Sequence, residues 1–213
     1  MPEKAPAEYI VLGLDIIRYS EKKLLLQKTA QERVDHCFNE AVKQCRPEDD
    51  SPMPHWIDAG DGGFALFKWA EAEVLDVLIE FYKRLNRGND GKTEDVQKVL
   101  VRSAIHKDYV VAWDTQIAGR EVNKFTGHAI NNCARLMAGM IKDHEAQAIC
   151  SRPILDALMA MDLLVSATRL KDIEDKHGHL HEVWNLRISP TLGVDPIAKE
   201  LHPEPLLRVY PDA

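Results

Sequence analysis

Two aspartates stand at positions where the chain could assemble a metal site. Asp61 lies in the stretch IDAGDGGFALF, residues 57–67, where three glycines surround the acid and an apolar run follows directly. Asp15 lies near the end of YIVLGLDII, residues 9–17, a β-branched run typical of a buried strand. Because glycines permit a tight hairpin turn, a sheet that pairs these strands would bring both carboxylates to one edge.

This pair of carboxylates has a specific chemical use. Hard divalent cations such as Mg²⁺ and Mn²⁺ prefer carboxylate oxygens, particularly where substrate phosphates complete the coordination shell. Asp15 and Asp61 could therefore serve a two-metal site that activates one oxygen and steadies a leaving group. The alternative is that both are ordinary turn and strand-end residues, since Asp is common in turns.

A second pair of polar residues lies on a predicted helix over residues 127–142, GHAINNCARLMAGMIK. Asn131 and Arg135 are four residues apart and therefore share one face of that helix. An amide can orient a sugar oxygen and a guanidinium can bind a phosphate, so the pair suits phosphoryl transfer. The alternative is a solvated helix face with a surface arginine.

The rest of the chain predicts the elements that must position these residues. We expect a strand at 9–17, a helix at 20–45, strands around Trp56 and over 64–68, a helix at 71–87, paired strands at 99–105 and 109–112, a helix at 127–142, a short strand at 149–150, a helix at 153–161, and paired strands at 169–173 and 181–186. The order βαββαββαβαββ predicts an α+β domain in which helices cover a mostly antiparallel sheet.

Composition limits the function classes. The chain has 213 residues, 45% of them hydrophobic, which favours one domain with one core. Its formal net charge of -7 disfavours nucleic acid as a partner. No run approaches the length of a membrane span, and the four cysteines form no CxxC pair, so we expect a cytoplasmic protein with reduced thiols and no direct membrane contact. Residues 1–8 are expected to be a flexible start, 9–188 the folded domain and 189–213 a proline-rich arm.

Four sequence blocks, in family order, resemble the class III nucleotidyl cyclases. They are LDIIRYS at 14–20, AGDGGFALF at 59–67, VRSAIH at 101–106 and GHAINNCARL at 127–136. The resemblance spans residues 9–186 and implies the ferredoxin-like catalytic domain of that family.

The resemblance also implies a homodimer packed head to tail, with two composite active sites at its interface. Asp15, Asp61 and the backbone carbonyl of Ile16 would hold two divalent ions, Mn²⁺ or Mg²⁺. Asn131 and Arg135 would come from the other subunit, the first orienting the ribose and the second stabilising charge on the triphosphate.

In such a site the ribose 3'-hydroxyl of a nucleoside triphosphate attacks the α-phosphate in line and releases pyrophosphate. Lys171, in RLKDIEDK, stands where the family often places a lysine that contacts the triphosphate. Lys176 is a competing choice for that contact.

The positions that read the base depart from both purine patterns. Family members that make cyclic AMP have a lysine four residues before the hairpin aspartate and Asp or Thr three before the helix glycine, whereas those that use GTP have Glu and Cys. Here these positions are Ile57 and Lys124. An apolar Ile57 cannot hydrogen-bond a base edge. Arg18 and Tyr19 replace the family's usual Gly-Phe pair, and their bulk favours a base with one ring.

A compact cyclase domain with an altered purine code resembles the bacterial pyrimidine cyclases of the anti-phage Pycsar defence systems. That resemblance implies conversion of UTP, or less readily CTP, to a cyclic nucleotide that activates a separate effector. One alternative is an adenylate cyclase that tolerates Ile57 and Lys124, and another is a degenerate domain that binds nucleotide without turnover. The related diguanylate cyclases carry a second acid in their hairpin, which GDGGF at 60–64 lacks.

Overall fold

The computed structural model of the chain describes residues 5–92, 97–138, 148–160, 167–170, 172–174, 178 and 180–186. Its elements are β1 (Ala7–Ile16), the 3-10 helix η1 (Tyr19–Glu21), α1 (Leu24–Cys45), β2 (His55–Asp58), β3 (Gly62–Phe67), α2 (Glu71–Asn89), β4 (Val101–Ile117), β5 (Arg120–Gly127), α3 (His128–Ala138), β6 (Ala148–Ser151), α4 (Arg152–Ala160), β7 (Ala167–Arg169), β8 (Ile173–Glu174), β9 (Leu180–His181) and β10 (Val183–Leu186).

One large sheet has the strand order β2-β3-β1-β4-β6-β10-β7. Strand β5 pairs with the C-terminal part of β4, residues 110–117, and β8 and β9 form a separate pair. Among the strand pairs of the described residues, β4 with β6 is parallel and the others are antiparallel. The predicted α+β class with a mostly antiparallel sheet is therefore confirmed, and β1 is an interior strand between β3 and β4.

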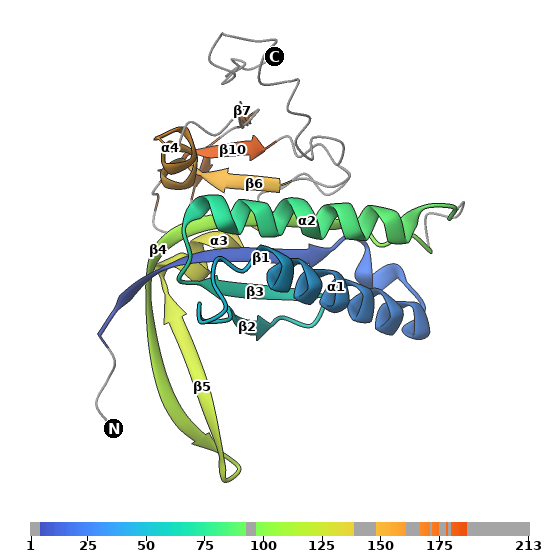
Figure 1. Cartoon of the computed structure of the whole chain (residues 1–213), viewed down its shortest axis with the longest axis horizontal. Coiled ribbons are helices and arrows are strands. Elements are labelled where there is room, and N and C mark those ends of the chain that lie inside the picture. Colours follow the sequence, from blue (N-terminus) through green and yellow to red (C-terminus); the bar gives the residue numbers. More distant parts are fainter. Residues whose placement is uncertain are drawn as a thin grey trace.

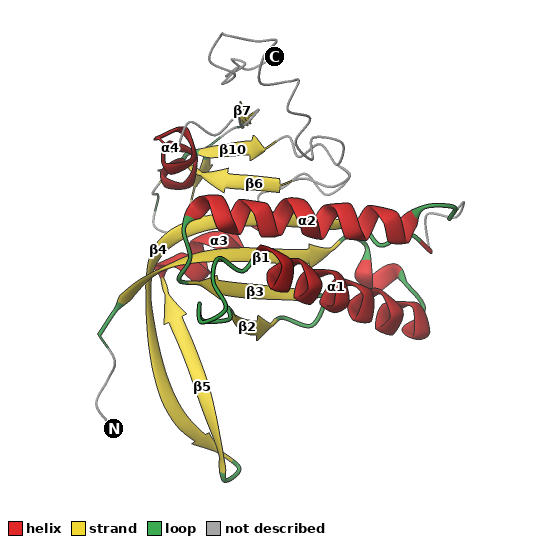
Figure 2. Ribbon diagram, viewed as in Figure 1, coloured by secondary structure: helices red, strands yellow, loops and turns green. Residues whose placement is uncertain are grey.

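Helices cover both faces of this sheet, and alternate residues of β1 serve the two cores. Leu12, Leu14 and Ile16 face the larger core, to which α1, α2 and α4 contribute. Tyr9 and Val11 face the smaller core beneath α3. Figure 2 shows α1 and α2 on the near side of the sheet and α3 behind it.

Helix α2 shows how the sequence encodes this packing. Its buried apolar side chains recur at helical spacing and lie against the sheet: Val74, Leu75, Val77, Leu78, Phe81, Tyr82 and Leu85. At its start the Glu73 carboxylate accepts a hydrogen bond of 2.7 Å from the Ala70 N–H, which satisfies a backbone donor that the helix leaves unpaired.

The prediction of separate strands at 99–105 and 109–112 is wrong, because β4 is continuous from Val101 to Ile117. The polar residues that interrupt the apolar pattern find partners within the fold. His106 is buried, and the Lys107 ammonium lies 2.8 Å from the Glu71 carboxylate. Polar groups that are paired in this way do not have to end a strand.

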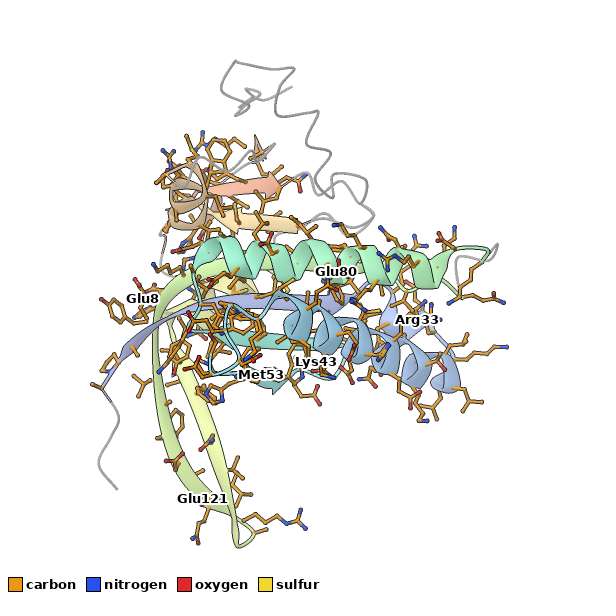
Figure 3. All side chains as sticks on the ribbon, viewed as in Figure 1. Glu8, Arg33, Lys43, Met53, Glu80 and Glu121 are labelled. Atoms are coloured by element: carbon orange, nitrogen blue, oxygen red, sulfur yellow. The ribbon has the colours of Figure 1, made fainter. Side chains whose placement is uncertain are left out.

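Strand β5 was not predicted. It pairs with β4 from Val110 opposite Gly127 to Ile117 opposite Arg120, and the two-residue turn of Ala118 and Gly119 has positive φ at both positions. Figure 1 shows the far part of β4 and β5 extending as an arm away from the helices. In Figure 3 the labelled Glu121 lies near its tip.

Two further expectations concern the whole chain. The four cysteines are unpaired, as predicted, and three of them are buried. In the described part of the chain, no helix is both long enough and apolar enough to cross a membrane.

Candidate active site

Asp15 lies at the end of β1, on the face of the sheet that α3 covers. Its direct neighbours across the strands are Gly62 on β3 and Arg102 on β4. The Asp15 side chain is 17% exposed, and its carboxylate accepts a hydrogen bond of 2.5 Å from the Arg102 Nε. The carboxylate is thus held by a charged partner while it still faces solvent.

Asp61 is brought beside Asp15 by the backbone of the β2–β3 hairpin. The Ile16 N–H donates a hydrogen bond of 2.8 Å to the Asp61 carbonyl, which fixes the hairpin tip to the end of β1. Within the tip, the Asp58 carboxylate accepts a bond of 2.8 Å from the Gly60 N–H. This contact stabilises the turn that presents Asp61.

The glycine after Asp61 is required by close approach of the chains. A Cβ atom at Gly62 would lie 2.0 Å from the carbonyl oxygen of Leu14. Only glycine lets β3 begin this close to β1. Gly62 therefore keeps the preceding residue, Asp61, next to the end of the strand that carries Asp15.

A cavity of about 300 Å³ opens beside the two carboxylates. Its lining residues come from the end of β1, from η1 and from two neighbouring segments: Asp15, Ile16, Ile17, Arg18, Tyr19, Ser20, Glu21, Asp61 and Arg102. The guanidinium of Arg102 gives this acidic cavity a cationic wall, which can bind phosphate oxygens.

Arg102 is a site residue that the sequence reasoning missed. Its block, VRSAIH, was noted, but a sequence does not give the register of β4 against β1. Only that register places Arg102 opposite Asp15. A basic residue near the start of a predicted strand, in a block that resembles the cyclase family, was the available signal.

The electrostatic surroundings of the Asp15 and Asp61 carboxylates favour binding of a divalent cation. Burial raises the pKa of Asp15, the Arg102 guanidinium lowers it, and the nearby Asp61 carboxylate raises it again. A cation between the two carboxylates would offset both the burial and the repulsion. No group of three or more His, Cys, Asp or Glu side chains that could hold a metal occurs within the described residues, so substrate oxygens would have to complete the shell.

Two of the predicted site residues adjoin these aspartates. Ile16 has a buried side chain in the larger core, and its backbone lies at the hairpin contact. Tyr19 lies in η1, where it lines the cavity and also packs against the larger core. Tyr19 is therefore both an aromatic residue of the larger core and part of the cavity wall.

Asn131 and Arg135 lie elsewhere in the same chain. Asn131 is exposed on the outward face of α3, and the half-buried Arg135 donates a hydrogen bond of 2.8 Å from Nη1 to the Asn132 Oδ1. Neither residue lines the cavity beside Asp15 and Asp61. Within one copy of the chain, these two predicted residues are therefore not brought to the cavity that Asp15 and Asp61 line.

The two positions that would read the base lie on β2 and β5. Ile57 is half-buried and packs against the smaller core, whereas Lys124 is exposed on β5. The residue next to it, Phe125, contacts the His55 ring with 4.8 Å between ring centroids. Strands β2 and β5 therefore lie next to each other where His55 contacts Phe125. Lys171 and the competing Lys176 lie outside the described residues.

Comparison with known proteins identifies the fold. No protein-family model matches the chain, and no curated protein matches it. Similar solved structures include the adenylyl cyclase CyaB from P. aeruginosa, with a TM-score of 0.67 and 10% identity, covering 89% of this chain and 97% of that one. The guanylyl cyclase Cya2 has a TM-score of 0.69 and 12% identity, covering 91% and 98%.

A third similar structure is the adenylate/guanylate cyclase/hydrolase from Silicibacter pomeroyi, with a TM-score of 0.62 and 17% identity, covering 86% of this chain and 98% of that one. At these identities the likeness establishes the fold. The chain has the fold of the class III cyclase catalytic domains, which confirms the fold that the four sequence blocks predicted.

Proposed function

We propose that this chain is a nucleotide cyclase that converts a pyrimidine nucleoside triphosphate, preferentially UTP, to its 3',5'-cyclic monophosphate and pyrophosphate. The observation that carries the proposal is the juxtaposition of Asp15 and Asp61 at one end of an interior strand of a class III cyclase fold. The adjoining cavity, with Arg102 in its wall, supports a site for a triphosphate.

The active site is composed of two copies of the chain. The separation of Asn131 and Arg135 from the cavity that Asp15 and Asp61 line supports this part of the proposal. The extended arm of β4 and β5 supports a dimer, because a two-stranded ribbon has little stability by itself. Ile117 on this arm is 48% exposed, which is apolar surface that a second copy would cover.

In the reaction, the ribose 3'-hydroxyl attacks the α-phosphorus, a new P–O bond forms, the bond to pyrophosphate breaks and the hydroxyl proton is released. Asp15, Asp61 and the Ile16 carbonyl would hold two divalent ions, Mg²⁺ or Mn²⁺, whose charge favours the ionised hydroxyl and the leaving group. Asn131 orients the ribose, and Arg135 stabilises the charge that develops on the phosphates.

The preference for a pyrimidine rests on the walls of the site. Ile57 offers no hydrogen bond to a purine edge and is already packed against the smaller core. Tyr19 occupies part of the cavity margin beside the proposed metal site. Lys124, exposed on β5, is available to a carbonyl oxygen of a one-ring base, and Lys171 is assigned to the triphosphate.

The biological role follows from the resemblance to pyrimidine cyclases of anti-phage defence. The cyclic nucleotide would act as a second messenger on a separate effector protein in the cytoplasm. The protein itself would need neither nucleic acid nor a direct membrane contact for this role.

Turnover of each of the four ribonucleoside triphosphates with Mn²⁺, with products separated by chromatography, tests the function. We expect cyclic UMP as the main product, less cyclic CMP, and no product from the Asp61→Asn variant. Efficient conversion of ATP or GTP with neither pyrimidine used would instead assign a purine cyclase. Binding of nucleotide without any product would assign a degenerate domain.

A further inference from the structure

A buried amide lies between the smaller core and the proposed catalytic arginine. Asn132 is 9% exposed on the inner face of α3, where its neighbours Ala129, Cys133 and Leu136 are apolar. A buried amide costs stability unless its polar atoms are paired, and Asn is a weak helix former. A hydrophobic residue would fit this position better if packing were its only purpose.

Both ends of the Asn132 amide have partners, and these lie in opposite directions. The Oδ1 accepts the bond of 2.8 Å from the Arg135 Nη1, one helical turn further along α3. The Nδ2 lies 3.3 Å from the Nε2 of His106 on β4. A chain of contacts thus runs from the rigid centre of the sheet to the guanidinium on the helix surface.

The ionisation state of His106 suits this arrangement. Burial lowers the pKa of His106 to about 4, with the Asp108 carboxylate opposing the shift and His181 adding to it. Because Arg135 can only donate, the Asn132 atom that faces it is the oxygen, and the Nδ2–H faces Nε2 of His106. A neutral imidazole accepts that N–H with its own proton on Nδ1, which is buried and has no hydrogen-bond partner among the described residues. That acceptance fixes the amide orientation, so the Asn132 oxygen points toward Arg135.

We infer that Asn132, held by His106, positions the guanidinium of Arg135 for phosphoryl transfer. The inference rests on the proposed function, because it assigns the purpose of the contact to catalysis by Arg135. Neither Asn132 nor His106 touches substrate in this account. A guanidinium has several N–H donors in a planar fork, so a bond from Nη1 to Asn132 restrains the plane in which its other donors lie.

The first test is kinetic and uses a double-mutant cycle. We expect Asn132→Leu to lower kcat by about 10-fold or more while KM changes by less than about 3-fold, since the guanidinium acts mainly in the transition state. In the Arg135→Ala background, Asn132→Leu should have no further effect. Asn132→Asp keeps an oxygen acceptor for Arg135 but loses the N–H that meets His106, so it should retain part of the activity that Asn132→Leu loses. Additive losses in the double variant would overturn the inference.

A control variant separates positioning from general damage to α3. Cys133→Ala also alters the inner face of this helix, where the thiol lies 3.3 Å from the Ala104 carbonyl oxygen, but it leaves the contact between Asn132 and Arg135 intact. We expect Cys133→Ala to lower the melting temperature with kcat unchanged. A similar fall in kcat for both variants would mean that Asn132 is only a packing residue.

A second measurement does not depend on activity. In NMR spectra of the guanidinium nitrogens, we expect the Arg135 side chain to give restrained signals in the wild type and in Asn132→Asp, and averaged signals in Asn132→Leu. Unchanged Arg135 signals in Asn132→Leu would overturn the inference. If this signal changes as expected but the wild type makes no cyclic nucleotide, the positioning contact stands and the proposed function fails instead.

Discussion

Single residues in this chain combine a structural contact with an electrostatic one. Asp15 pairs with Arg102 while it faces Asp61, and His106 is buried beneath α3 with Asn132 at its Nε2. Burial pushes the pKa of the carboxylate up and that of the imidazole down, in both cases because it disfavours the charged form. These groups therefore make the stability of the fold depend on pH.

His106 gives a measurable pH dependence. Its pKa is about 4 in the folded protein and near 6.5 in the unfolded chain. Between these values the unfolded chain binds a proton that the folded protein does not, so the free energy of unfolding falls as pH drops. Urea denaturation should show the wild type losing about 2 kcal/mol more than His106→Gln between about pH 7.5 and about pH 5. Equal losses in both proteins would contradict the burial of a neutral imidazole.

At the scale of elements, the β2–β3 hairpin holds the site together through backbone contacts. The bond from the Ile16 N–H to the Asp61 carbonyl and the close approach of Gly62 to Leu14 fix the position of the second carboxylate. Substitutions in this hairpin should therefore affect stability and activity together.

Two glycines of the hairpin allow a matched comparison. Gly60 has φ of +91°, and a Cβ atom there would meet no other atom within 4 Å. A Cβ atom at Gly62, in contrast, would collide with the Leu14 carbonyl. We expect Gly60→Ala to cost about 1 kcal/mol from backbone strain alone. Gly62→Ala should cost about 3 kcal/mol, because β1 and β3 must separate to admit the methyl group. Denaturation midpoints measure both, and a larger effect at Gly60 would show that close approach is not the constraint.

The sequence predicts these elements to different degrees, for physical reasons. The β2–β3 hairpin is local, because glycines and an apolar run mark it within a few residues, and α2 follows from its helical spacing. Strand β5, REVNKFTG, has little apolar alternation, since it is stabilised by pairing with β4 along the arm. The pairing of Arg102 with Asp15 and the burial of His106 depend on strand register and on α3 above the sheet, which local patterns do not contain.

At the scale of the whole molecule, one chain keeps the two sets of proposed site residues apart. Asp15 and Asp61 open into a cavity on one surface, while Asn131 and Arg135 lie on α3 and do not line it. The two-fold symmetry of a homodimer would join each set to its complement and form two sites.

The most direct test of an active site shared between two copies of the chain is complementation between two impaired variants. The proposal makes Asp61 a metal ligand and Arg135 a group that stabilises transition-state charge, so Asp61→Asn by itself should form no cyclic nucleotide and Arg135→Ala by itself should turn over at least about 100-fold more slowly than the wild type. Co-expression of both should restore about a quarter of the wild-type activity, because half of the dimers are mixed and each mixed dimer has one intact site. No recovery in mixed dimers of confirmed composition would contradict a site shared between two copies of the chain.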